Sequence, residues 1–134
     1  MKQELQDKLF NKYPWIFRQK DLPMDQTCMC WGITTGDGWY NIIDTLCDQI
    51  QRYIQHNLNK DKDPGVVKVE AAQVKEKFGA LRFYYTGGDE FISGLVCMTE
   101  SLSRKTCETC GAPGKSEDKS GWIKTLCSGC QDKK

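Results

Sequence analysis

Residues 107–130 read CETCGAPGKSEDKSGWIKTLCSGC, and this stretch decides how the C-terminal part of the chain folds. It contains two pairs of cysteines in CxxC spacing, separated by sixteen residues: Cys107 with Cys110, and Cys127 with Cys130. This pattern is typical of a zinc site with four cysteine ligands, because each pair supplies two sulfurs from one tight turn. We therefore predict that the four thiolates bind one structural Zn²⁺ ion.

The alternatives to a structural zinc site are two disulfides, four unrelated thiols or a catalytic zinc. The chain has eight cysteines, which suit either a secreted disulfide-rich protein or metal thiolates in a reducing compartment. Its first residues, MKQELQDKLF, hold no apolar stretch as long as that of a signal peptide, which favours the reducing compartment. A catalytic zinc keeps one coordination position for water, whereas four cysteines close the shell. We expect the ion to stabilise the fold and to take no part in catalysis.

Glycines shape the loops around the predicted ion. Gly111 follows the first cysteine pair and Gly129 lies inside the second. Glycine at these positions permits a left-handed backbone and lets N–H groups approach the thiolates. Gly121 is expected at a turn before a short strand over residues 122–126. This arrangement resembles a zinc ribbon, which we assign to residues 104–134.

The segment before the ribbon predicts a two-stranded hairpin. Leu81, Phe83 and Tyr85 alternate with residues that suit an exposed strand face, which predicts a strand over residues 81–86. The first strand, over residues 66–77, is ambiguous, because its apolar residues also fit the spacing of a helix.

Three helices are expected from apolar residues placed three or four positions apart, at residues 5–13, 39–54 and 90–102. Asp89 is expected to cap the third of them, because an aspartate side chain can accept hydrogen bonds from the first N–H groups of a helix. Two polar stretches are interpreted as loops: residues 18–38, which can also hold short strands, and residues 59–65.

Four cysteines lie outside the ribbon. Cys47 and Cys97 are expected to be buried, because each falls on the apolar face of a predicted helix. Cys28 and Cys30 could form a second metal site with His56, the one histidine of the chain. The alternative is that His56 is a solvated residue near a helix end.

These elements together predict an α+β fold with a body over residues 1–103, in which the hairpin packs on two or three helices. The length of 134 residues and an apolar fraction of 39% suit one compact core. The formal net charge of +1 gives no general attraction to phosphate or to anionic lipid. No run approaches the ~18 apolar residues that cross a bilayer, so we expect a soluble, cytoplasmic protein without a membrane partner.

Residues 87–91 spell GGDEF, the string that names the diguanylate cyclases. Those enzymes also need further metal-binding carboxylates and a second motif upstream, which this chain lacks. The residues that follow fit a helix, whereas the cyclases have a strand there. We interpret the string as a glycine turn that leads into an aspartate-capped helix.

Three blocks of sequence, GDGWYNIIDTLC at 36–47, QVKEKFGALRFYYTGGDEF at 73–91, and CETCGAPG with GWIKTLCSGC within 107–130, resemble a family of small uncharacterised phage and prophage proteins. The resemblance covers most of the chain but does not include QTCMC at 26–30. It implies a viral accessory protein that acts in a bacterial cytoplasm. It implies no particular activity.

We favour a non-enzymatic binding protein without catalytic residues. The chain has no phosphate-binding loop and no nucleophile elbow, and it has a single histidine. The preferred partner is a host or phage protein, which the chain would bind in order to counter a host defence system. Four aromatic residues could anchor such an interface, although they are more typical of a core: Trp15, Trp31, Trp39 and Tyr40.

Two other ligand classes remain open. Nucleic acid could bind the hairpin and ribbon through six cations, Lys75, Lys77, Arg82, Lys115, Lys119 and Lys124, with Tyr84 or Trp122 as a stacking surface. Such a charged hairpin is more typically a solvated edge. A nucleotide could bind between the hairpin and the helix that begins near Trp39, with five candidate residues: Asp37, Asp44, Arg82, Tyr84 and Asp89.

Overall fold

A computed structural model describes residues 1–58 and 68–131 of the chain, and it has the predicted α+β fold. The α-helices are α1 (Gln3–Lys12), α2 (Tyr40–Leu58), α3 (Glu90–Ser103) and α4 (Ser128–Gln131). The strands are β1 (Ile33–Thr34), β2 (Val69–Lys77), β3 (Ala80–Gly87), β4 (Lys115–Lys119) and β5 (Trp122–Leu126). The short 3₁₀ helices are Arg18–Asp21, Met29–Trp31 and Asp37–Trp39. The loop predicted at residues 59–65 lies outside the described residues.

The predicted hairpin is confirmed as β2 and β3, which pair antiparallel with Val74 opposite Phe83. Its tip is formed by Phe78 and Gly79, which both have positive φ angles, of 52° and 79°. β1 joins the other edge of β2 in parallel, with Ile33 opposite Val74, to give a sheet in the order β1-β2-β3. The stretch expected to be a loop or short strands holds the two-residue strand β1, with short 3₁₀ helices, turns and irregular segments around it.

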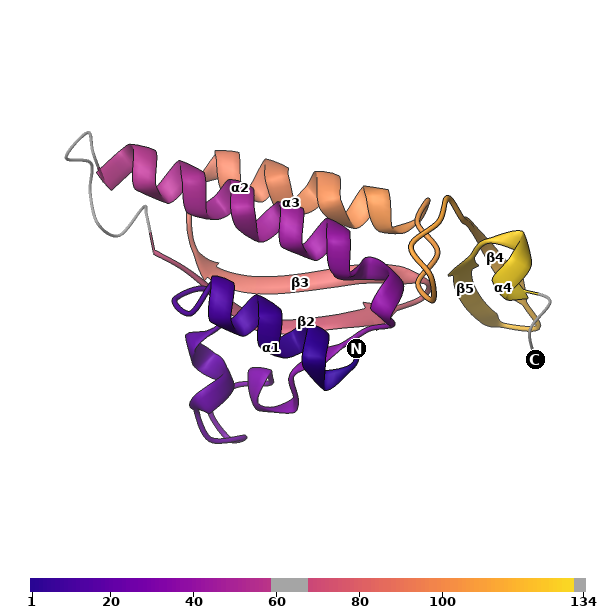
Figure 1. Ribbon diagram of the computed structural model, residues 1–134, viewed down its shortest axis with the longest axis horizontal. Coiled ribbons are helices and arrows are strands. Elements are labelled where there is room, and N and C mark those ends of the chain that lie inside the picture. The colour runs from indigo at the N-terminus through magenta and orange to yellow at the C-terminus, as the bar shows by residue number, and fades with distance from the viewer. Residues whose placement is uncertain (59–67, 132–134) are drawn as a thin grey trace.

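The helices α2 and α3 run side by side in opposite directions along the sheet, as Figure 1 shows. The predicted cap of α3 is confirmed, because the Asp89 carboxylate accepts hydrogen bonds from the N–H groups of Phe91 and Ile92, at 3.1 and 3.2 Å. The Tyr53 hydroxyl of α2 donates a further hydrogen bond to the same carboxylate. The GGDEF string is therefore a turn and a helix cap, as interpreted from the sequence.

One core lies between the helices and the inner face of the sheet. The largest fully buried side chain is Trp39, which precedes α2, and α1 adds Leu9. Burial of such side chains is worth about 1.5–3 kcal/mol each and dominates the stability of a domain of this size. Other fully buried side chains come from most of the remaining elements: Ile16, Phe17, Met29, Ile33, Ile43, Ile50, Val74, Leu81 and Ile92.

The two helix cysteines differ in burial. Cys47 is buried in α2, as predicted, and burial raises the pKa of its thiol far above the usual value. Cys97 was predicted to be buried but is exposed, because the core-facing positions of α3 are those of Ile92, Val96 and Thr99. A helix turns by 100° per residue, so position 97 points to a different side of α3 from these three. The sequence does not reveal which side of α3 faces the core, because this helix is apolar on more than one face.

Candidate metal centre

The four predicted ligands come together in the structure. The Sγ atoms of Cys107, Cys110, Cys127 and Cys130 all lie within 4.8 Å of one another, and those of Cys110 and Cys127 are 3.6 Å apart. Four sulfurs placed ~2.3 Å from one ion, at the corners of a tetrahedron, lie about 3.8 Å from one another. The cluster therefore has the donor atoms and nearly the dimensions of a tetrahedral metal site. All eight cysteines are unpaired, so the disulfide alternative is not what the structure shows.

Each cysteine pair is held by a tight turn, as the CxxC spacing requires. The N–H of Gly111 donates to the carbonyl oxygen of Cys107 at 2.9 Å, and Gly111 has a φ of 84° that favours glycine. In the second pair, the N–H of Cys130 donates to Cys127 Sγ at 3.4 Å, within the single turn of α4. This N–H group stabilises negative charge on a ligand, which is a common feature of thiolate metal sites.

The electrostatics of the cluster favour a bound cation. Burial of Cys107 on its own would raise the pKa of its thiol, but N–H groups of the surrounding backbone outweigh this effect and lower the pKa. The pKa of Cys130 is raised, mainly because its thiol is hydrogen-bonded to Cys127, and also because Cys107 lies nearby. A second thiolate in this space is repelled by the first. A divalent cation removes that repulsion and allows all four groups to ionise.

The residues between the cysteine pairs form a hairpin that returns the chain to the first pair. β4 and β5 pair antiparallel, with Lys119 opposite Trp122, and the turn contains Ser120 and Gly121, which both have positive φ angles. β5 confirms the strand predicted over residues 122–126. β4 was not predicted, because Lys115–Lys119 is polar on both faces and shows no alternation.

The metal site is docked on the body through Glu108, a residue inside the first CxxC pair that the sequence did not single out. Its carboxylate accepts a hydrogen bond from the N–H of Gly36 at 2.8 Å, and its carbonyl oxygen accepts one from the N–H of Gly38 at 2.7 Å. The Trp39 indole donates to the carbonyl oxygen of Thr106 at 2.8 Å. These contacts join the start of α2 to the first ligand turn.

A second set of contacts joins the ribbon to the tip of the body hairpin. The Thr125 hydroxyl donates to the carbonyl oxygen of Gly79 at 2.6 Å. A Cβ placed on Gly79 would lie 2.8 Å from Ile123 Cγ2, so the two segments are in close contact. The ribbon and the body hairpin therefore form one continuous surface in this region.

The predicted aromatic anchors separate into buried and exposed residues. Trp39 was considered for a binding surface but has no exposed area, because its indole lies in the core beside Thr106. Tyr40 is half-buried. Trp15 and Trp31 are 75% and 65% exposed, although the sequence analysis favoured a core position for them.

The five residues considered for a nucleotide site do not form one site. The Asp44 carboxylate accepts hydrogen bonds from Lys12 and Tyr13, and the Asp89 carboxylate caps α3. Asp37 accepts a hydrogen bond from the backbone N–H of residue 2. A cleft of about 380 Å³ exists elsewhere, and none of the five lines it. It is lined by residues of α1 and of the 3₁₀ helices, among them Gln3, Gln6, Phe10, Lys20, Cys30 and Trp31.

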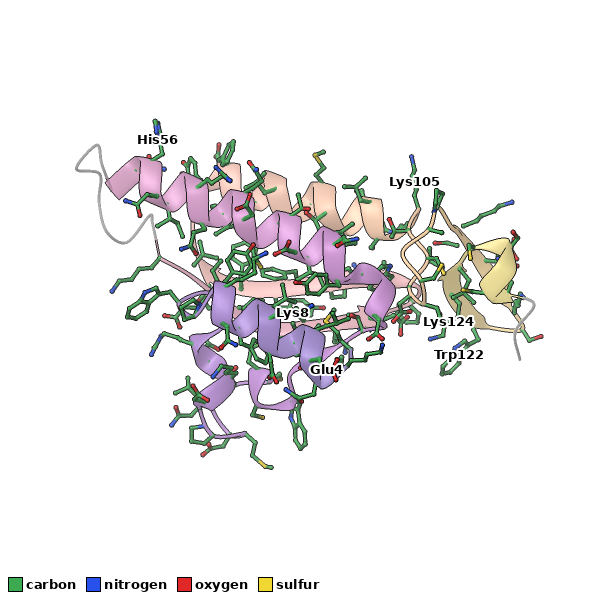
Figure 2. The ribbon with its side chains drawn as sticks, in the orientation of Figure 1. Glu4, Lys8, His56, Lys105, Trp122 and Lys124 are labelled. Carbon is green, nitrogen blue, oxygen red and sulfur yellow. The ribbon has the colours of Figure 1, made fainter. Side chains whose placement is uncertain are left out.

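A second metal site at Cys28 and Cys30 is not supported. Within residues 1–58 and 68–131, the four ribbon cysteines are the one group of side chains placed to hold a metal ion. The Cys30 thiol is bonded to the carbonyl oxygen of Thr27 at 3.4 Å. His56 lies at the far end of α2 from the ribbon and points away from the sheet (Figure 2).

Several predicted cations do come together, on the outer face of the sheet. Leu81 and Phe83 are buried in the core, and side chains alternate along a strand, so Arg82 and Tyr84 emerge on the opposite face. The cross-strand partner of Arg82 is Lys75. We define the outer sheet face by five residues: Thr34, Lys75, Lys77, Arg82 and Tyr84.

Comparisons of the chain with protein-family models, with curated proteins and with solved structures give no match. Among the described residues, no helix is both long enough and apolar enough to cross a membrane.

Proposed function

We propose that this chain is a non-enzymatic zinc-binding protein that binds single-stranded nucleic acid on its outer sheet face. Zinc is the proposed ion because four thiolates in a tetrahedron suit Zn²⁺, which binds sulfur well and has no redox chemistry. Four protein ligands leave no position for water or substrate, so the ion supports the fold. The observation that carries the nucleic-acid assignment is the pairing of Lys75 and Arg82.

Lys75 and Arg82 lie directly opposite each other on neighbouring strands. Like charges in this position destabilise a sheet, by some tenths of a kcal/mol. Within the described residues, no ion pair joins Lys75, Lys77 or Arg82 to a carboxylate. The Nε atom of Arg82 is also buried and has no hydrogen-bond partner there. A phosphate group would compensate the charge of these cations.

Exposed aromatic side chains continue this surface to the hairpin tip. Phe78 is 66% exposed, and the Lys77 ammonium lies 5.6 Å from the centre of its ring. On the ribbon, Trp122 is 68% exposed and has Lys124 6.0 Å from its ring (Figure 2). Phe78 precedes Gly79 in the sequence and Trp122 precedes Ile123, and Gly79 and Ile123 are in close contact. Aromatic surfaces among cations are typical of proteins that stack and neutralise single-stranded nucleic acid.

The net charge of +1 limits this interaction to the local surface. Long-range attraction to a polyanion depends on the charge of the whole molecule, whereas phosphate contacts depend on cations within a few ångströms. We therefore propose a short site of a few nucleotides.

Phage origin, action in a bacterial cytoplasm and a role against host defence remain predictions from the resemblance. The host or phage protein first favoured as partner would most simply use the exposed Trp15 and Trp31.

The nucleic-acid proposal is tested by fluorescence anisotropy with a labelled single-stranded oligonucleotide at several salt concentrations. For single strands, the slope of log K against log[salt] is about −0.7 per phosphate contact. We expect Arg82→Gln and Lys75→Gln each to weaken binding and to reduce the slope by about 0.7. The matched control is Lys8→Gln on α1, an exposed lysine away from this surface (Figure 2). Binding with no salt dependence, or equal loss in the control, contradicts the proposal.

Stacking and metal binding are tested with paired variants. Trp122→Ala is expected to weaken oligonucleotide binding by about 1–3 kcal/mol, the range for one stacked base. Trp15→Ala, which removes a similarly exposed indole elsewhere, is expected to leave oligonucleotide binding unchanged.

Elemental analysis should find one zinc per chain. Cys110→Ser is expected to lose the metal and Cys28→Ser, also at an exposed cysteine, to keep it.

A further inference from the structure

The helix α3 is apolar on a side that the core does not use. Ile92, Val96 and Thr99 face the core. Phe91, Met98 and Leu102 nevertheless remain 51%, 64% and 43% exposed, and Leu95 is partly buried beside them. We define the α3 stripe as these four residues: Phe91, Leu95, Met98 and Leu102.

The α3 stripe has the geometry of a helix contact surface. Its members are separated by four, three and four residues, so they form one row along the helix. The row borders α2, because Phe91 stacks on Tyr53 with ring centres 4.4 Å apart. A solvated helix normally presents polar residues outside its core-facing side, and a continuous exposed apolar row is typical of an interaction surface.

The charges around the α3 stripe show which partner it fits. Glu90 lies at the start of the helix, and Arg104 and Lys105 lie just after its end. The only charged residue between them is Glu100, whose carboxylate accepts a hydrogen bond from the N–H of Phe83 in the sheet. The stripe is therefore an uncharged row with a negative group at one end and positive groups at the other. In Figure 2, Lys105 points away from the sheet at that positive end.

This pattern is complementary to itself when two copies lie antiparallel. A two-fold axis between Leu95 and Met98 places Phe91 of each copy near Leu102 of the other. It also brings Glu90 of each copy to the positive end of the other, where Arg104 is exposed. A closed two-fold contact requires this kind of self-complementary surface. Antiparallel packing also aligns the helix dipoles favourably.

We propose that a second copy of this chain docks on the α3 stripe, with the two α3 helices antiparallel. The contact does not use the outer sheet face, which lies across the sheet from α3. The dimer is therefore independent of the nucleic-acid proposal, and either can fail alone.

Sedimentation velocity of the zinc-loaded full chain over a range of concentrations tests the dimer. We expect a monomer–dimer equilibrium for the wild-type chain, and a dimer dissociation constant raised at least about tenfold by Met98→Glu, which places two carboxylates near the axis. In other words, the dimer of this variant should form only at concentrations at least that much higher. The matched control is Met24→Glu, because Met24 is 67% exposed outside the stripe. Circular dichroism should show both variants folded, since both positions are mostly exposed.

Charge exchange tests the antiparallel arrangement. Glu90→Arg alone and the double variant Arg104→Glu with Lys105→Glu should each weaken the dimer, because each places like charges in contact. An equimolar mixture of the two should restore it, since every end contact then pairs opposite charges. A wild-type chain that stays monomeric up to roughly 0.1 mM overturns the proposal, and a different protein then becomes the occupant to seek. A dimer that Met98→Glu leaves intact, or a mixture without recovery, overturns it equally.

Discussion

Gly38→Ala is expected to damage the junction between the body and the metal site. A Cβ built on Gly38 would lie 2.2 Å from the carbonyl oxygen of Cys107, 2.5 Å from the backbone nitrogen of Gly111 and 2.7 Å from the carbonyl carbon of Glu108. All three are backbone atoms of the first ligand turn, so no flexible side chain can move aside. The turn has to shift away from the start of α2.

The size of the effect follows from the contacts that this shift breaks. Overpacking costs about 1–3 kcal/mol, and loss of the hydrogen bond from the Gly38 N–H to Glu108 adds about 1 kcal/mol. Unfolding entropy of about 2.1 cal/mol/K per residue corresponds to about 0.28 kcal/mol/K for this chain. A loss of about 2–4 kcal/mol therefore lowers Tm by about 7–14 °C.

Differential scanning calorimetry of the zinc-loaded chain measures this change. Gly94→Ala is the control, because nothing lies within 4 Å of a Cβ at that position and alanine favours a helix. It should raise Tm by a few degrees, in line with a gain of about 0.5–1 kcal/mol. A Gly38→Ala chain that melts within about 2 °C of the wild type would refute the close contact on which this reasoning rests.

Two further changes test individual groups. The hydrogen bond from the Tyr53 hydroxyl, with those from the N–H groups of Ile92 and Phe91, holds the pKa of Asp89 below its usual range. The unfolded chain therefore takes up this proton at a higher pH than the folded chain, and stability falls as pH drops through the folded pKa. Asp89→Asn should reduce that acid-side slope in unfolding titrations, and an unchanged slope contradicts the assignment. Phe78→Asn should raise Tm, because asparagine adopts the φ of 52° at a cost about 1 kcal/mol lower than phenylalanine does. The same change should weaken oligonucleotide binding. Unchanged binding would show that Phe78 does not contact the ligand.

The elements that could be predicted from sequence are those with a local signal. The spacing of Cys107, Cys110, Cys127 and Cys130 specifies a metal site, because four thiols in two tight turns have few other arrangements. The alternation around Phe83 specifies a strand. In both cases the information lies within a few residues of the element.

The parts that could not be predicted depend on contacts between distant segments. Glu108 is an ordinary acidic residue in sequence, and its role depends on the N–H groups of Gly36 and Gly38, which lie far away along the chain. Trp39 and Trp31 have the same residue type but opposite burial, because the first meets the ribbon and the second lies at the surface. Periodicity alone identifies an apolar helix but not which of its faces meets the core.

The same holds for the candidate binding surface. Lys75 and Arg82 were both candidates from the sequence, but only the strand register places them opposite each other. The unpaired Nε of Arg82 has no sequence signal at all. Likewise, the sequence gives no sign that Asp44 and Asp89 each accept a hydrogen bond from a tyrosine hydroxyl in the fold.

The position of Glu108 also bears on how the chain can be divided. If the polypeptide were cut after Ser103, the amides of Gly36 and Gly38 would lose their acceptors and the indole of Trp39 would lose the carbonyl of Thr106. The N-terminal fragment would then expose to water a partly apolar surface with unpaired hydrogen-bond donors. Attempts to isolate the two halves should therefore give an aggregating N-terminal piece, and proteolysis should proceed by global opening instead of by release of an intact fragment.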